Sequence, residues 1–221
     1  KSDLSIQVHP DDDFALENES SYGKTEMWYV LDTKPGAGLY VGFKRDVSRE
    51  EVESAVKDGT VTELLNFVPT KKGDVFFIPA GTVHAIGAGN LICEVQQSSN
   101  CTYRLYDYDR VDRYGNKREL HLEKALEVAD YRKYEPQSLD GEGDLICRCK
   151  YFEVLVHNID CELTVPTDDS KFDAVVCLEG EGQISCADSK VSLVRGDSVF
   201  LPASKDPIVY TGHMKVLQCY V

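Results

Sequence analysis

The stretch Gly73–His84, GDVFFIPAGTVH, returns further along the chain as Gly196–Pro207, GDSVFLPASKDP. Both copies begin with Gly-Asp, continue as a short apolar run typical of a strand, and include Pro-Ala. A second pair, Lys24–Leu31 and Lys171–Leu178, aligns more loosely. The first pair is offset by 123 residues and the second by 147, a difference of 24 residues. This self-similarity predicts two related β-units, and the difference predicts that the first unit carries an insertion.

Short runs rich in Val, Ile, Phe and Tyr dominate the 221 residues and are separated by Gly, Pro, Asn and Asp. Several short strands at this spacing are typical of a sandwich or barrel, so we expect an all-β fold. The expected strands are Met27–Leu31, Gly38–Phe43, Asp74–Ile78, Leu91–Gln97, Tyr103–Tyr108, Tyr151–Val156, Ala174–Leu178, Gln183–Cys186, Ser198–Leu201 and Met214–Tyr220.

Two segments show the pattern of helices instead. Ser48–Glu51 is a capping box, apolar residues follow at helical spacing, and Gly59 is the expected stop. A further turn is expected over Thr62–Phe67, so that the helical stretch near 48–67 has about the length of the insertion that the offsets require. Leu120–Tyr131 predicts a second helix, because its apolar residues recur on one side.

The net charge of −14 bears on which partners the chain can bind. Nucleic acid and anionic membrane surfaces would both be repelled, so we expect neither as a partner. The sequence has no apolar run long enough to span a bilayer and no basic-then-apolar signal segment at its start, which predicts a cytoplasmic protein. An anionic ligand would need a local cationic pocket. The oligomeric state is left open.

Residues suited to metal binding gather in the first half of the chain. Ser5–Pro10 alternates polar and apolar residues, so in a strand Gln7 and His9 share one face. Glu26 opens an expected strand, and His84 ends the turn after Pro-Ala. Imidazole, carboxylate and amide donors together suit a divalent transition metal, with zinc preferred. The alternative for each histidine is a hydrogen-bonded structural role.

Charged residues also interrupt two later strands. Glu94 lies in an apolar run, and Arg104 and Arg110 share one face if their strand is regular. A buried carboxylate or guanidinium is costly unless it is paired or used in a site. For Asp107 and Asp109, an ordinary solvated face is the simpler interpretation.

Five separated blocks of this chain closely resemble type I mannose-6-phosphate isomerases, in particular the short bacterial form. The resemblance covers about residues 1–130 and continues more loosely into the second β-unit. It implies a cupin fold, here two cupin-type β-barrel or jelly-roll units with short helical insertions. The blocks are Gln7–Pro10, Gly23–Tyr29, Pro79–Gly89, Glu94–Asn100 and Tyr103–Arg110.

The resemblance also implies an activity in carbohydrate metabolism: a zinc-dependent aldose-ketose isomerase that interconverts mannose 6-phosphate and fructose 6-phosphate through an enediol, with one zinc per chain. Carried over by position, the zinc ligands are Gln7, His9, Glu26 and His84. The catalytic residues are Arg104, Lys24 and Glu94, and the substrate-binding residues are Lys24, Arg104, Arg110 and Asn100.

We therefore expect residues 1–130 to form the metal-binding catalytic unit. Residues 131–221 are expected to form a linker and a degenerate second cupin unit without metal ligands, because Pro207 replaces the histidine and no Gln-x-His pair precedes Asp173. The family has a further segment before the block that starts at Leu4, so we expect the chain to be the later part of a longer polypeptide. The alternatives are a non-catalytic sugar-phosphate-binding cupin, a regulatory homologue, or a cupin iron dioxygenase, which usually has a histidine-rich ligand set.

Overall fold

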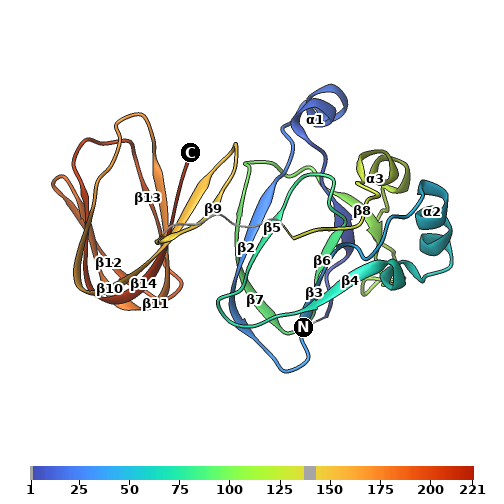
Figure 1. Ribbon diagram of the computed structural model, residues 1–221, viewed down its shortest axis with the longest axis horizontal. Coiled ribbons are helices and arrows are strands. Elements are labelled where there is room, and N and C mark those ends of the chain that lie inside the picture. The colour runs from blue at the N-terminus through green and yellow to red at the C-terminus, as the bar shows by residue number, and fades with distance from the viewer. Residues whose placement is uncertain (1, 137–142) are drawn as a thin grey trace. The chain divides into compact units, whose positions relative to one another are not determined.

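The computed structural model describes residues 2–136 and 143–221 (Figure 1). The chain divides into two compact units, Lys1–Gln137 and Ser138–Val221. The expected all-β class is confirmed, since strands dominate both units. Residues 137–142, within the region where we expected the linker, lie outside the described residues. None of the helices in the described ranges has the length and apolar character to cross a membrane.

The first unit contains strands and three α-helices within its described residues. In chain order these are β1 (Ile6–Val8), α1 (Asp12–Glu19), β2 (Glu26–Thr33), β3 (Gly38–Phe43), α2 (Arg49–Lys57), the 3-10 helix η1 (Val61–Leu64), β4 (Leu65–Pro69), β5 (Val75–Ile78), β6 (His84–Ile86), β7 (Asn90–Gln96), β8 (Tyr103–Tyr106) and α3 (Leu122–Val128).

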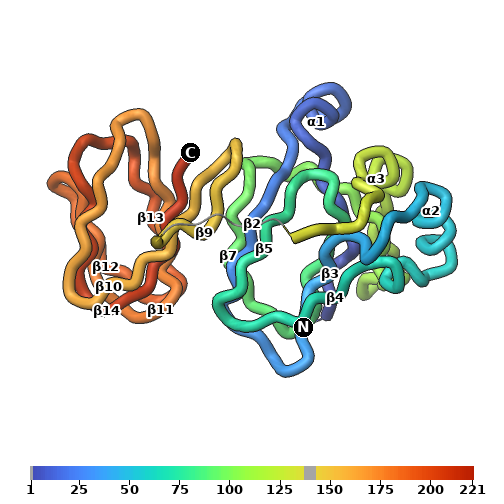
Figure 2. The backbone as a smooth tube through the Cα atoms, in the orientation of Figure 1, coloured from blue at the N-terminus to red at the C-terminus, as the bar shows by residue number. Residues whose placement is uncertain are grey.

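These strands form two antiparallel sheets, whose course Figure 2 follows along the chain. The larger has the order β4-β3-β6-β1-β8 and the smaller the order β5-β2-β7. Trp28 and Ile78 of the smaller sheet pack against Leu39 and Val41 of the larger one, and all four are buried. The two sheets therefore face each other across an interior, and this interior holds the candidate site.

The outer face of the larger sheet is covered by helices α2 and α3 (Figure 1). Ile6 and Val8 of β1 are buried against Val52 of α2 and Leu126 of α3. Because side chains alternate along a strand, Gln7 between them points to the opposite face, toward the interior. The covering helices thus determine which face of β1 is available for chemistry.

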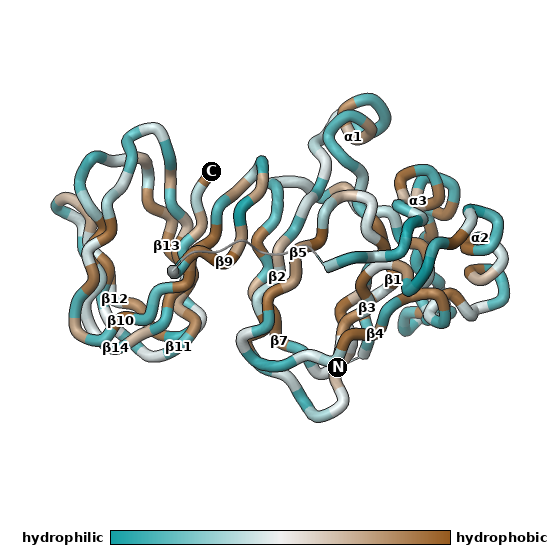
Figure 3. The backbone as a smooth tube through the Cα atoms, in the orientation of Figure 1, coloured by the Kyte–Doolittle hydropathy of each residue, from teal (hydrophilic) through white to brown (hydrophobic). Residues whose placement is uncertain are grey.

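The helix predictions are confirmed in part. The Ser48 hydroxyl accepts a hydrogen bond from the backbone N–H of Glu51, so α2 begins at the expected cap. The helix α3 is shorter than predicted, and the turn expected over Thr62–Phe67 is wrong beyond Leu64, because β4 starts at Leu65 to pair with β3. The helix α1 was not predicted: it is largely hydrophilic, as Figure 3 shows, and only Ala15 is fully buried.

The second unit is a single antiparallel sheet around its own core. Its strands are β9 (Leu145–Arg148), β10 (Glu153–Val165), β11 (Asp173–Cys186), β12 (Ser189–Val194), β13 (Ser198–Leu201) and β14 (Ile208–Tyr220). The order is β12-β11-β14-β10-β9, with β13 also paired to β11. The core is built from residues such as Val175, Ile184, Tyr210 and Val216, all of which are buried.

Three long strands of this sheet bend along one line of residues. Cys161 of β10 pairs with Gly212 of β14, which pairs in turn with Gly182 of β11. Cys161 and Gly212 have positive φ angles of 92° and 121°. We call this row the fold line. The expected strands Ala174–Leu178 and Gln183–Cys186 are both confirmed as strand, but they are two parts of one strand, β11, which pairs with β14 on both sides of the bend.

The strand register reproduces the sequence repeat. Glu26 pairs with Ile78 in the first unit, and Asp173 pairs with Leu201 in the second, which matches both offsets. The turn that opens each copy makes the same contact: the N–H of Gly73 donates to the carbonyl of Val30 at 2.8 Å, and that of Gly196 donates to Cys177 at 2.9 Å. Asp173 therefore occupies the position in the second unit that Glu26 occupies in the first.

The fold line predicts a steric limit at Gly182. A Cβ atom there would lie 2.3 Å from the carbonyl oxygen of Thr211, so Gly182→Ala must push β11 and β14 apart. We expect a loss of about 1–3 kcal/mol in the free energy of unfolding, measured by urea titration. Glu181→Ala, at the exposed neighbouring position, is the control and should change this free energy by less than about 0.5 kcal/mol. Equal stability of the two variants would contradict the close approach.

Candidate metal centre

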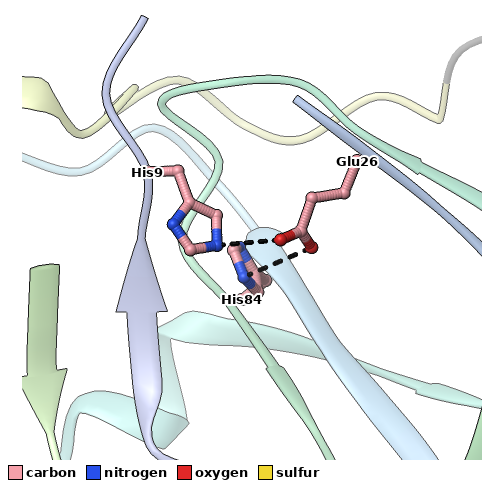
Figure 4. Close-up of side chains that lie close together, drawn as sticks. All are labelled: His9, Glu26 and His84. Carbon is pink, nitrogen blue, oxygen red and sulfur yellow. Dashed lines mark ion pairs between the residues drawn. The ribbon is translucent and has the colours of Figure 1, made fainter. Parts of the chain in front are cut away.

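Three of the four predicted metal ligands meet in the interior of the first unit (Figure 4). His9 follows β1, Glu26 opens β2 and His84 opens β6, and all three are buried. One ligand atom from each lies within 4.8 Å of the other two. The His9 Nε2 atom is 3.0 Å from Glu26 Oε1, and the His84 Nε2 atom is 4.0 Å from Glu26 Oε2. We call these residues the His-Glu-His cluster.

Gln7 adjoins the cluster as well. It pairs with His84 in the register of β1 and β6, and its side-chain amide nitrogen lies 3.3 Å from His84 Nε2. The amide carries an oxygen and a nitrogen on one carbon, so a half-turn about its last bond would present the oxygen instead. Gln7 therefore lies beside His84 at the edge of the His-Glu-His cluster, and its role as a fourth ligand stays a prediction.

Backbone carbonyls set the orientation of both imidazoles. The Nδ1 atom of His9 lies 2.8 Å from the carbonyl oxygen of Cys101, and that of His84 lies 2.8 Å from the carbonyl oxygen of Thr82. A carbonyl oxygen can only accept, so each Nδ1 carries the proton and donates it. Each ring therefore turns its Nε2 atom toward Glu26 while a backbone carbonyl holds its Nδ1, which is the arrangement that metal-binding histidines adopt.

In the described part of the chain, His9 Nε2 is buried without a hydrogen-bond partner, and the Glu26 Oε1 atom that it faces forms an ion pair with the Lys24 ammonium. The His9 Nε2 and Glu26 Oε1 atoms lie 3.0 Å apart in the interior, where a charged carboxylate needs a positive charge or a donor beside it. Nitrogen and oxygen donors of this kind suit zinc, so the residues fit the predicted ion.

The charge states of the cluster also suit a cation. Burial alone would raise the pKa of Glu26, but the contact with His9 and the charges of His84 and Lys24 bring this pKa down to about 2. Burial, followed by the neighbouring His9, lowers the pKa of His84 to about 4. At neutral pH the site thus offers an ionised carboxylate and a neutral imidazole, the forms that bind metal.

Lys24 and Glu94, predicted as catalytic residues, lie beside the cluster. The Lys24 ammonium forms an ion pair with Glu26 Oε1 and lies 3.4 Å from Glu94 Oε1. Glu94 pairs with Trp28 in the register of β7 and β2, so its side chain shares the inner face with Glu26. The two carboxylates balance the buried Lys24 ammonium, so an anionic ligand would need further positive charge from elsewhere in the site.

Arg104, the third predicted catalytic residue, lies one strand away from the histidines. It pairs with Gln7 in the register of β8 and β1, which puts both side chains on the inner face. Its Nη1 donates to the carbonyl oxygen of Glu119 at 2.7 Å, whereas its buried Nε has no partner among the described residues. Its guanidinium therefore retains a free N–H beside the sheet that carries the metal donors.

The two remaining predicted substrate residues lie apart from the cluster. Arg110 binds the buried carboxylate of Asp107 together with Arg118, and its guanidinium lies 5.1 Å from the ring centre of Tyr108. Asn100 is exposed and lines a surface cavity of about 620 Å³. No hydrogen bond or ion pair within the described ranges joins either residue to the His-Glu-His cluster, and their roles stay predictions.

Trp28 belongs to the site but was not predicted from the sequence. Its indole N–H donates to Glu26 Oε2 at 2.9 Å, and its ring meets that of His84 edge-on, with centroids 5.3 Å apart. The available signal was the spacing of two residues from Glu26 within one strand, which places both side chains on the same face. The carbonyls of Cys101 and Thr82 had no comparable signal.

The Asp107 ion pairs predict a dependence of stability on pH. Burial would raise the pKa of Asp107, but its hydrogen bonds to Arg118 and Arg110 hold it below the ordinary value of 3.8. A lowered pKa in the folded state stabilises the protein above pH 3.8, and this contribution is lost as the pH falls through the folded pKa. We expect Asp107→Asn to lower the free energy of unfolding by about 1–3 kcal/mol at pH 7. The difference from the parent should shrink in acid, and a difference that is constant from pH 7 to pH 3 would contradict this account.

Comparisons with known proteins agree with the geometry. Residues 141–221 match the family described as "Mannose-6-phosphate isomerase, cupin domain". The chain is 36% identical over 220 residues to the mannose-6-phosphate isomerase of Streptococcus mutans serotype c, a match that covers 97% of this chain and 69% of that protein. It is 38% identical over 208 residues to the mannose-6-phosphate isomerase ManA of Bacillus subtilis, covering 90% of this chain and 65% of that protein.

Solved structures show the same relationship. The crystal structure of the mannose 6-phosphate isomerase from Bacillus subtilis superimposes with a TM-score of 0.88 at 35% identity, covering all of this chain and 72% of that one. A structure described as a putative mannosephosphate isomerase from Archaeoglobus fulgidus has a TM-score of 0.78 at 26% identity, with 99% and 68% of the two chains covered. The chain thus spans roughly two thirds of the length of these relatives, and it belongs to the mannose-6-phosphate isomerase family.

Proposed function

We propose that this chain interconverts mannose 6-phosphate and fructose 6-phosphate with one zinc ion bound by Gln7, His9, Glu26 and His84. The observation that supports the metal most directly is the buried His-Glu-His cluster, whose three ligand atoms lie within 4.8 Å of one another. Family membership supports the substrate class, because relatives carry this activity in their names. A cytoplasmic location remains the prediction made from the sequence.

The proposed reaction moves one proton between adjacent carbons through an enediol. A base removes the proton from C2 of the open-chain aldose while O1 gains a proton; C1 then gains a proton while O2 loses one. When bound, the metal ion would supply Lewis-acid chemistry and orient the sugar hydroxyls. Glu94 is partly exposed and can accept the carbon-bound proton, and Lys24, 3.4 Å away, can donate a proton to the sugar oxygen.

Arg104 is proposed to bind the negative charge of the substrate. Its guanidinium is always charged and presents N–H groups in a planar fork that matches a phosphate or an enediolate. The unpartnered Nε on the inner face supports this role, because a buried N–H is expected to find an acceptor. Arg110 and Asn100 are proposed as more distant substrate contacts.

We further propose that residues 1–130 form the catalytic unit and that residues 131–221 provide the linker and a second unit without metal ligands. The register supports this division. Gln7 pairs with His84 in the first unit, whereas Pro207 stands at the position of His84 in the second and the next residue, Ile208, pairs with Val165, so no metal-binding side chain lies there. Asp173 is the one donor that has a counterpart in the first unit, namely Glu26.

The metal ligands can be tested one at a time. His9→Ala and His84→Ala should each lower the zinc affinity of the chain by more than about 100-fold, because a lost ligand costs more than a lost outer-shell contact. Elemental analysis of purified protein and competition with a chelator measure this loss. His213→Ala is the matched control, since His213 is exposed in the second unit and pairs with Asp160. Parent-like zinc content in both cluster variants would refute the site.

The role of Arg104 predicts a separation between turnover and metal content. Arg104→Ala should reduce isomerase turnover roughly 100-fold or more while keeping zinc and fold, and Arg104→Lys should restore only part of the rate. A coupled assay for fructose 6-phosphate measures turnover, with Arg132→Ala as the control at an exposed ion pair. Near-normal turnover by a zinc-loaded Arg104→Ala protein would exclude the catalytic role. If zinc-loaded parent protein binds mannose 6-phosphate without turnover, the non-catalytic cupin is the correct alternative.

A further inference from the structure

Trp28 is enclosed within the first unit beside the metal donors. It lies two residues after Glu26 on β2, so both side chains point to the inner face. Only 1% of its surface is exposed, and Leu39, Val41 and Ile78 pack around it. This packing holds the indole in one place, and the position of its N–H is therefore determined by the core.

The indole assigns different roles to the two oxygens of Glu26. An indole N–H is a donor only, and here it donates to Oε2 at 2.9 Å. The other oxygen, Oε1, faces Nε2 of His9 at 3.0 Å. One oxygen is thus held by the indole, with His84 Nε2 4.0 Å away from it, while the other faces His9 Nε2 and the Lys24 ammonium.

The ring of Trp28 also contacts a second ligand. Its plane is inclined by 76° to that of His84, with centroids 5.3 Å apart. Such an edge-on contact restricts rotation of the imidazole, whose Nδ1 is already held by the carbonyl of Thr82. His84 is therefore fixed on one side by a hydrogen bond and on another by the indole.

We propose that Trp28 is a positioning residue of the metal centre: it withholds Glu26 Oε2 so that Oε1 alone is presented to the ion, and it holds His84 in its binding orientation. This inference rests on the proposed metal site. The inference extends the site beyond its ligands, because the coordination geometry of the ion then depends on a core residue that does not contact the ion. A role in core packing alone would change stability and leave metal affinity unaltered.

The composition of the chain allows a conservative test. Trp28 is the single tryptophan among the 221 residues, so a tryptophan analogue supplied during expression replaces this side chain alone. Benzothienylalanine has nearly the shape of tryptophan but carries sulfur in place of the N–H, so it removes the hydrogen bond and keeps the packing. Trp28→Phe is the second variant, which removes the donor and part of the ring.

Zinc affinity and the absorption spectrum of bound Co²⁺ are measured in the 221-residue chain, without reference to activity. Both variants should bind zinc about 10–100-fold more weakly than the parent, the usual effect of losing an outer-shell hydrogen bond. Their Co²⁺ bands should shift, because the freed carboxylate can ligate with both oxygens. Tyr210→Phe is the control: it removes a buried donor to Gln218 in the second unit and should leave both readouts unchanged.

The outcomes separate this inference from the function on which it rests. If the parent chain binds neither zinc nor Co²⁺, the metal site fails and the positioning role fails with it. If the parent binds both ions and the two Trp28 variants match it in affinity and spectrum, the positioning role alone is overturned. Weaker zinc binding and shifted Co²⁺ bands in the benzothienylalanine protein, with parent-like binding by Tyr210→Phe, would establish it.

Discussion

Burial of the Glu26 carboxylate is the constraint on which the first unit depends. A charged group inside a protein is strongly unfavourable unless its surroundings compensate for lost water. Here β2 is the middle strand of its sheet, so Glu26 has a neighbouring strand on each side and cannot turn to solvent. The compensation comes from His9, Trp28 and Lys24, which reach the carboxylate from β1, from β2 and from the turn before β2.

The second unit meets a related constraint without ionic compensation. Asp173 lies at the position of Glu26, and Gln218 pairs with Val175 as Glu94 pairs with Trp28. The amide of Gln218 donates to Asp173 at 2.7 Å and accepts from the Tyr210 hydroxyl at 3.0 Å. Burial raises the pKa of Asp173, whereas the pKa of Glu26 is lowered. The same barrel position therefore supports a hydrogen-bonded network in one unit and an ionised carboxylate with charged and polar partners in the other.

Local patterns in the sequence predicted those features that depend on neighbouring residues. The capping box at Ser48 and the alternation around Gln7 rest on backbone geometry within a few residues, and both are observed. The assignment of catalytic roles came from family resemblance, since spacing alone left a structural histidine as an alternative. Features that need distant segments were missed: the carbonyl of Cys101 orients His9 across 92 residues of chain. Strand β12 was missed although it contains Val191, Leu193 and Val194, because its apolar residues are few and interrupted by polar ones, and glycines in β11 resembled turns.

The fold line has a mechanical consequence for the second unit. Backbone pairing of β10, β11 and β14 continues through Cys161, Gly182 and Gly212, so each strand contributes to the sheet on both sides of the bend. If one of these strands lost its pairing on one side of the bend, its continuation on the other side would be disturbed as well. We therefore expect this sheet to unfold as one cooperative unit. The first unit is built from separate sheets of shorter strands, joined across its interior by side chains. Side-chain packing, and not continuous backbone pairing, therefore holds its two sheets together, and we expect them to separate more readily than the two sides of the sheet in the second unit.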